Sequence, residues 1–192
     1  MQFFFVPDYR HNFRFFSSEP LHDIQVEFSR WKKLWAIAKE KLMLLPPRTL
    51  RQEQAFQNIA KFREESISIH YPENLGDKKV RRRFFFHLQK QKTKHILMLG
   101  GETILLPVSG LLALLPGPNV FFGVLALLMY THWQALRGIQ HLSKAECTFI
   151  PSLLLSQWHD SLGSLKEEDC LEVLEKMETE YQLTNLRKIL YK

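Results

Sequence analysis

The run Ile96–Trp133, ILMLGGETILLPVSGLLALLPGPNVFFGVLALLMYTHW, decides the fold class that the sequence predicts. Glu102 is its only formally charged residue. The first arm, Ile96–Leu115, has 20 residues and would extend about 30 Å as a helix, the thickness of the hydrocarbon core of a bilayer. The second arm, Val120–Trp133, would extend only about 21 Å. The run predicts a membrane-embedded segment whose second arm is short for a full crossing.

The tetrapeptide Pro116-Gly117-Pro118-Asn119 separates the two arms and predicts a turn, because both prolines lack a backbone donor and glycine accepts a positive φ. The run then forms a helical hairpin with both ends on one side. Cationic side chains flank it: Lys78, Lys79, Arg81, Arg82, Arg83, Lys90, Lys92 and Lys94 before it, and Arg137 and Lys144 after it. By the positive-inside rule, both chain termini face the cytoplasm or the mitochondrial matrix.

A hairpin buried in the core of a soluble helical bundle is the alternative interpretation. Gly100, Gly101, Pro107 and Gly110 interrupt the run and are compatible with either environment. The length of the apolar run favours the membrane.

Charge is unevenly distributed along the chain. Residues 1–95 carry 19 Lys or Arg and 10 Asp or Glu, a net charge of +9, whereas residues 96–192 carry 7 and 10, a net charge of −3. A basic half indicates an anionic partner, either a phospholipid surface or a nucleic acid. The long uncharged run argues against nucleic acid, although RRRFFF at 81–86 combines cations with aromatic rings as single-strand binders do.

The motifs of enzymes and cofactor sites are missing from the sequence. It contains no phosphate-binding glycine loop, no HExxH pair and no GxSxG elbow. Its eight histidines show no i, i+4 pair, and its two cysteines cannot build a structural zinc site. We therefore expect no enzymatic activity, no cofactor and no metal.

The segments outside the run indicate a mainly α-helical protein with a small two-stranded β element. Phe3–Val6 is a predicted strand that could pair with the alternating segment Ile67–Tyr71. Helices are predicted over 24–45, 49–65 and 77–95, with amphipathic helices near the C-terminus starting at the capping box Ser164–Glu167. The predicted organisation is a basic α+β region (1–95), the membrane hairpin (96–138) and a C-terminal helical cap (139–192).

Two groups of residues are candidates for function. The first could couple protons or ions, because acids and histidines inside an apolar run are costly and can carry protons: Glu102, His132, Asn119 and Arg137. Glu102 could equally reach the headgroups, and His132 could be an interfacial residue without a role. The second group combines tryptophans and cations at a predicted lipid surface: Trp31, Lys32, Lys33, Trp35, Arg81, Arg82, Arg83 and Trp133. Packing of the 24–45 helix on its own domain is an equal alternative.

The order of these features resembles the mitochondrial potassium–proton exchange-related family. The resemblance rests on the start MQFFFVP, a basic helix with tryptophans, ISIHYP, a basic run and the block LLPGPNVFFGVLALLMYTHWQALRGIQHL at 114–142. It implies a role in potassium–proton exchange at the mitochondrial inner membrane, or at a bacterial plasma membrane because no transit peptide is evident.

Because a single hairpin cannot enclose an ion path, the chain would act as an accessory factor or as an oligomeric subunit, with membrane lipids and further copies or a larger carrier as partners. A non-transporting scaffold that binds acidic phospholipids is the alternative.

Overall fold

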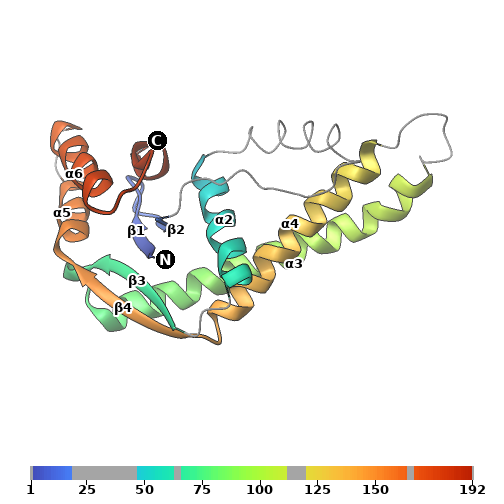
Figure 1. Ribbon diagram of the computed structural model, residues 1–192, viewed down its shortest axis with the longest axis horizontal. Helices are drawn as coiled ribbons and strands as arrows, with labels where there is room; N and C mark the ends of the chain where they lie inside the picture. Colours follow the sequence, from blue (N-terminus) through green and yellow to red (C-terminus); the bar gives the residue numbers. More distant parts are fainter. Residues whose placement is uncertain (1, 19–46, 63–65, 112–119, 164–166, 192) are drawn as a thin grey trace.

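The computed structural model describes residues 2–18, 47–62, 66–111, 120–163 and 167–191. In this part of the chain a mixed four-stranded sheet carries helices on both faces, and two long helices project from it as an arm (Figure 1). The sheet order is β2–β1–β3–β4, with strands β1 Phe3–Pro7, β2 Phe13–Ser17, β3 Ser66–Pro72 and β4 Glu146–Ser152. Strand β1 is antiparallel to β2 and parallel to β3, which is parallel to β4.

Strand β1 lies inside the sheet and is buried on both faces. Phe3 and Phe5 belong to the core on one side, and Phe4 and Val6 belong to the core on the other. Phe3 pairs with Ile69, which confirms the predicted pairing of the first strand with the 67–71 segment. An unbroken apolar run is typical of a strand covered on both faces.

The predicted two-stranded element is wrong in size, because β2 and β4 extend it to four strands. Both added strands lie at the edges of the sheet. Their sequences, FRFFS and ECTFIPS, contain a charge or a proline that an edge strand tolerates but that weakens a strand pattern.

Three helices cover one face of the sheet: α2 Pro47–Phe62, α3 Asp77–Leu111 and α4 Val120–Leu142. The opposite face is covered by α5 Leu153–Ser161, α6 Glu167–Glu180 and the short π-helical turn η4 Arg187–Tyr191. A 3-10 turn, η2 Glu73–Leu75, connects β3 to α3. The predicted helices over 49–65 and 77–95 are confirmed by α2 and α3. The predicted helix over 24–45, the turn at 116–119 and residues 164–166 of the capping box lie outside the described residues.

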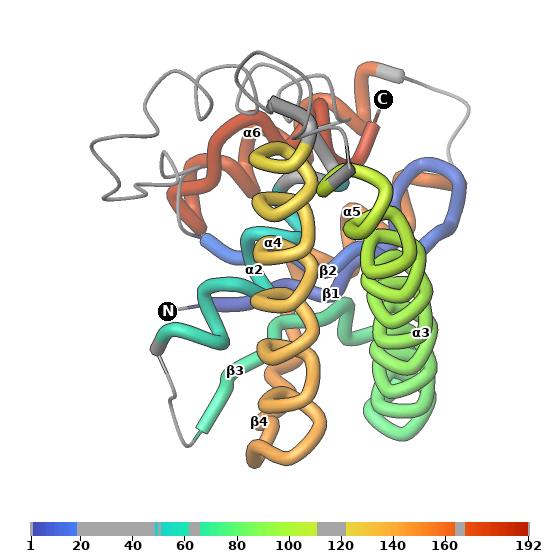
Figure 2. Tube along the Cα trace, turned by 90° about the vertical axis from the view of Figure 1, so that its right-hand side faces the viewer, coloured from blue at the N-terminus to red at the C-terminus, as the bar shows by residue number. Residues whose placement is uncertain are grey.

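Helices α3 and α4 lie side by side and run in opposite directions to form the arm (Figures 1 and 2). Within the described ranges, no helix has the combined length and apolarity needed to cross a bilayer. This finding overturns the predicted fold class, a membrane helical hairpin. The second half of α4 uses Ala135, Ile139 and Leu142 in the protein core, and α3 begins as a basic helix on the sheet.

The arm is attached to the sheet layer through a very close contact between α2 and α4. Gly138 of α4 lies against the backbone of Phe56 in α2, and a Cβ atom at position 138 would overlap the Phe56 carbonyl oxygen. Ala135 and Ile139, on either side of Gly138, are fully buried in the same core. Small side chains at this point set the distance between the two helices.

The substitution Gly138→Ala should lower the free energy of unfolding by about 3 kcal/mol, because the added methyl group forces α2 and α4 apart. The matched control is Gly100→Ala in α3, where a Cβ atom meets nothing within 4 Å. That control should gain about 0.5–1 kcal/mol from better helix propensity. Urea unfolding followed by circular dichroism measures both, and equal stability of the two variants would contradict the close contact.

His87 of α3 provides a pH-dependent contribution to stability. Its ring lies 5.7 Å from that of Phe5, and its buried Nε2 has no hydrogen-bond partner. Burial, with smaller contributions from Arg14 and Lys90, lowers the pKa of His87 to about 4. The unfolded chain protonates His87 near pH 6.5, so its contribution is complete above about pH 6.5 and is lost as the pH falls towards 4.

The substitution His87→Gln should therefore change the pH dependence of unfolding. Between pH 7 and pH 4, the free energy of unfolding of the parent should fall by on the order of 3 kcal/mol more than that of the variant. Urea unfolding of both proteins across this range measures it. A difference independent of pH would show that His87 protonates alike in the folded and unfolded chains.

Candidate functional site

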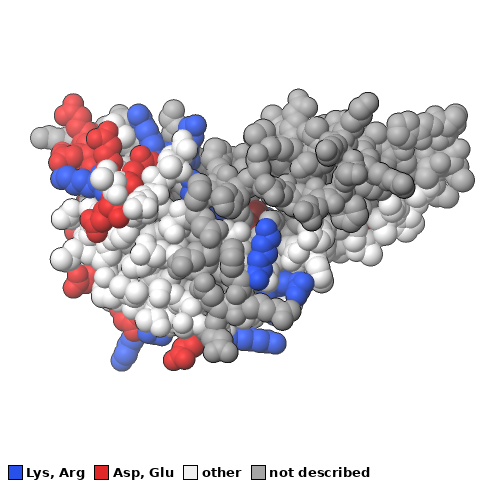
Figure 3. Space-filling view, in the orientation of Figure 1, with Lys and Arg blue, Asp and Glu red and all other residues white. Residues whose placement is uncertain are grey.

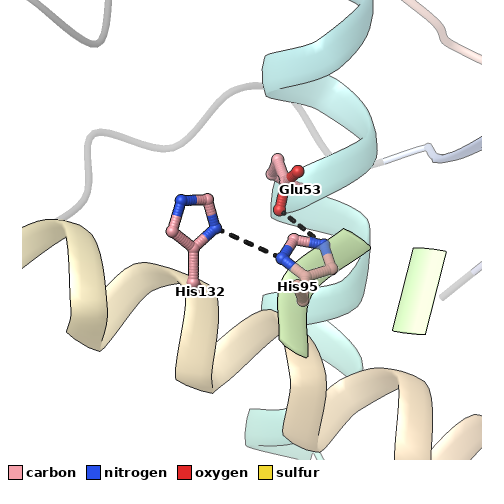
Figure 4. Close-up of side chains that lie close together, drawn as sticks. All are labelled: Glu53, His95 and His132. Atoms are coloured by element: carbon pink, nitrogen blue, oxygen red, sulfur yellow. Dashed lines mark hydrogen bonds and ion pairs between the residues drawn. The ribbon is translucent and has the colours of Figure 1, made fainter. Parts of the chain in front are cut away.

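Four titratable side chains form a row where α2, α3 and α4 meet, and we call them the polar row: Glu53, His95, His132 and Glu102. Glu53 Oε2 lies 3.3 Å from His95 Nε2, and His95 Nδ1 lies 3.2 Å from His132 Nδ1 (Figure 4). On its other side, His132 Nε2 lies 3.4 Å from Glu102 Oε1. The row thus crosses all three helices through consecutive contacts.

The α2–α4 contact explains why the polar row forms at this place. Glu53 precedes Phe56 by one helical turn, so it lies on nearly the same face of α2 that meets α4. His95 and Glu102 are seven residues apart on α3 and share the face that packs against α4. His132 of α4 therefore lies between them.

Burial suppresses charge at Glu53 and His95. The side chain of His95 is fully buried, and desolvation, assisted by His132 and Lys94, lowers its pKa to about 4. Burial also raises the pKa of Glu53, although Lys94 Nζ lies 3.2 Å from Glu53 Oε1 and opposes this shift. His95 is accordingly a neutral imidazole at physiological pH.

The other two members of the row are also mostly buried. The side chains of His132 and Glu102 are 19% and 12% exposed. Burial lowers the pKa of His132, with Lys94 adding to the effect, and raises the pKa of Glu102. Oε2 of Glu102 is buried without a hydrogen-bond partner.

The polar row has fewer protons than contacts when both histidines are neutral. Its three contacts join Glu53 to His95, His95 to His132, and His132 to Glu102. Each neutral imidazole contributes one N–H and one lone pair, so two protons serve three contacts whichever tautomers are present. With both carboxylates ionised, at least one of the three contacts therefore has an acceptor on both sides and no proton between them. The row can therefore take up one further proton or one cation.

Of the proton-coupling candidates, the structure brings Glu102 and His132 together. Arg137 instead lies outside the polar row, with its guanidinium 4.8 Å from the centre of the exposed Trp133 ring. Asn119 lies outside the described residues.

The predicted lipid-binding residues are divided. Trp31, Lys32, Lys33 and Trp35 lie outside the described residues. Arg81 pairs with Asp77 at 2.8 Å and lies over the Phe149 ring, Arg83 lies over the Phe13 ring, and Arg82 is exposed.

Glu53 and His95 are not among the residues that the sequence predicts for the site. Metal and catalytic motifs are recognised by ligands at a helical spacing within one segment, whereas here each of three helices contributes a separate ligand. Only one weak signal in the sequence points to His95. It is the last polar residue before the apolar run, where side chains are expected to be buried. Nothing in the sequence of α2 distinguishes Glu53.

Fold and site together define a class: a helix-covered mixed sheet with an apolar two-helix arm and a polar row at the base of that arm. A profile described as mitochondrial K+–H+ exchange-related matches residues 21–145. The chain therefore belongs to the mitochondrial K+–H+ exchange-related family, and the resemblance inferred from its sequence is confirmed. No curated protein and no solved structure gives a significant match.

The matched segment contains every residue of the polar row, together with α2, β3, α3 and α4. The start MQFFFVP, by contrast, lies outside it. Family membership associates the chain with mitochondrial potassium–proton exchange.

The contact between Glu102 and His132 can be tested by a double-mutant cycle with Glu102→Gln and His132→Gln. Because both substitutions remove the same contact, the double variant should be about 0.5–1 kcal/mol more stable than the sum of the single effects predicts. Urea unfolding at neutral pH measures the coupling. The matched control pairs Glu102→Gln with His141→Gln, on α4 but outside the row, and should be additive. Additivity in both cycles would show that the contact contributes nothing.

Proposed function

We propose that this chain acts in mitochondrial potassium–proton exchange as a subunit that self-associates through α3. The observation that carries the proposal is an apolar stripe on the outer face of α3, which we call the outer stripe: Leu97, Gly101, Ile104 and Val108. Leu97, Ile104 and Val108 are 70%, 75% and 55% exposed. Such a surface marks an interaction site when its members are contiguous.

The outer stripe is geometrically distinct from the face that packs on α4. At 100° per residue, positions 97, 101, 104 and 108 lie within about 60° of one another, and Leu99, Glu102 and Leu106 lie on the opposite face. Those three are only partly exposed, as expected on the side of α3 that packs against α4. Figure 3 shows the described outer end of the arm without charged side chains.

The spacing of the stripe favours a second copy as the partner. Steps of four, three and four residues are the spacing of a coiled-coil seam, which pairs helices of similar pattern. A Cβ atom at Gly101 would meet nothing within 4 Å, so another helix can approach closely there. With neighbours Met98 and Leu105, the exposed face amounts to roughly 600 Å² per copy, and about 1,200 Å² for a pair is the lower limit of a specific interface.

The sequence leaves open whether the chain is an accessory factor or an oligomeric subunit. Self-association through the outer stripe supports the subunit. The role that the sequence suggests for Glu102 and His132 in proton coupling stays a prediction. The polar row and the outer stripe lie on opposite faces of α3, so each can be changed separately.

The substitution Ile104→Glu should convert the self-associated chain into monomers, because it places a charge in the centre of the seam. It should also reduce potassium–proton exchange at least twofold in mitochondria that contain the variant as their only copy. Light scattering coupled to size exclusion measures mass, and potassium-driven proton flux measures exchange. Thr103→Glu is the matched control: Thr103 is exposed beside the stripe and should leave both unchanged.

A monomeric parent chain, or normal exchange by a monomeric Ile104→Glu variant, would contradict the proposal. The second of these outcomes would favour a lipid-binding scaffold instead. The first turns of α3 support that candidate, because they expose Lys78, Lys79 and Arg82 beside Phe86, which is 73% exposed. Cations next to exposed aromatic rings are typical of a surface that binds anionic lipid.

A further inference from the structure

The polar row has the donor atoms and the spacing of a metal site. Glu53, His95 and His132 each offer one ligand atom, and these atoms lie within 4.8 Å of one another. The two Nδ1 atoms are 3.2 Å apart. Two nitrogens bound to one tetrahedral ion at about 2.0–2.1 Å are separated by about 3.3 Å, so the histidines already stand at ligand spacing.

A cation between the two Nδ1 atoms also resolves the shortage of protons in the row. Both imidazoles then use their Nδ1 lone pairs for the ion and carry their protons on Nε2. His132 Nε2 lies 3.4 Å from Glu102 Oε1, which can accept its proton.

Glu102 lies where its carboxylate can accept a hydrogen bond from His132. Metal-binding histidines usually donate their second N–H to a carboxylate, which holds the tautomer and the ring orientation. Glu102 does this for His132 from within α3.

One neighbouring charge opposes metal binding. Lys94 Nζ lies 3.2 Å from Glu53 Oε1 and already partly neutralises that carboxylate. The other oxygen, Oε2, remains for the ion. A ligand set of one carboxylate and two neutral imidazoles suits a divalent ion of the zinc type. Mg²⁺ and K⁺ prefer oxygen ligands alone.

We propose that Glu53, His95 and His132 bind one divalent transition-metal ion of the Zn²⁺ type, with Glu102 orienting His132. Such an ion joins α2 to both helices of the arm. Its binding stabilises the base of the arm in the arrangement described above. This inference does not depend on self-association, because the outer stripe lies on the opposite face of α3.

The test is calorimetric titration of the untagged full chain with Zn²⁺, supported by visible absorption with Co²⁺ as a probe of coordination. We expect one ion per chain with micromolar or tighter affinity, the intense bands of four-coordinate Co²⁺ and no comparable binding of Mg²⁺. His132→Gln and Glu53→Gln should each weaken Zn²⁺ binding by more than about 100-fold, because each removes a ligand. Glu102→Gln should weaken it about 10–100-fold.

The matched control is His141→Gln, which lies on α4 like His132 but outside the row and should leave affinity unchanged. The ligand variants are limited to Glu53 and His132 because His95 is fully buried and its replacement endangers folding. Circular dichroism confirms that each variant is folded. The proposal is overturned if the folded parent binds no Zn²⁺, or if the two ligand variants bind it as tightly as the parent.

Discussion

The close contact of α2 and α4 at Gly138 is the constraint on which the site depends. With no side chain on Gly138, the backbone of Phe56 lies directly on α4. This contact aligns the buried Phe56 with Ala135 and Ile139 over the sheet. It also brings Glu53 within reach of histidines on two other helices. A larger residue at position 138 would move α2 away from α4 and so disrupt both the core and the polar row.

Helix α3 connects the parts of the molecule because its faces have different partners. Val80, Phe84 and Leu88 of its first half pack into the core below the sheet. Beyond His95, the face towards α4 carries Glu102, and the opposite face carries the outer stripe. Without a polar partner on α4, the carboxylate of Glu102 would be costly to bury between the two helices. The polar contact with His132 is what keeps Glu102 inside an otherwise apolar arm.

The polar row connects family membership to chemistry without assigning a mechanism. Its three contacts and two protons leave a place for one cation, and burial keeps His95 neutral. A proton and a transition-metal ion would compete for the same lone pairs. Residues that carry this arrangement all fall within the segment that matches the potassium–proton exchange-related family.

The sequence by itself determined the family, the β1–β3 pairing and the helices α2 and α3. It also singled out Glu102 and His132 as candidate functional residues. These follow from local patterns: an unbroken apolar strand, helical periodicity, and rare polar residues in an apolar run. Only the tertiary structure decided that α4 covers a sheet, that β2 and β4 complete it, and that Glu53 and His95 join the polar row. The physical reason is that apolarity indicates burial but not whether lipid or protein provides it. Likewise, a site whose residues come from three separate helices has no single spacing that a sequence can reveal.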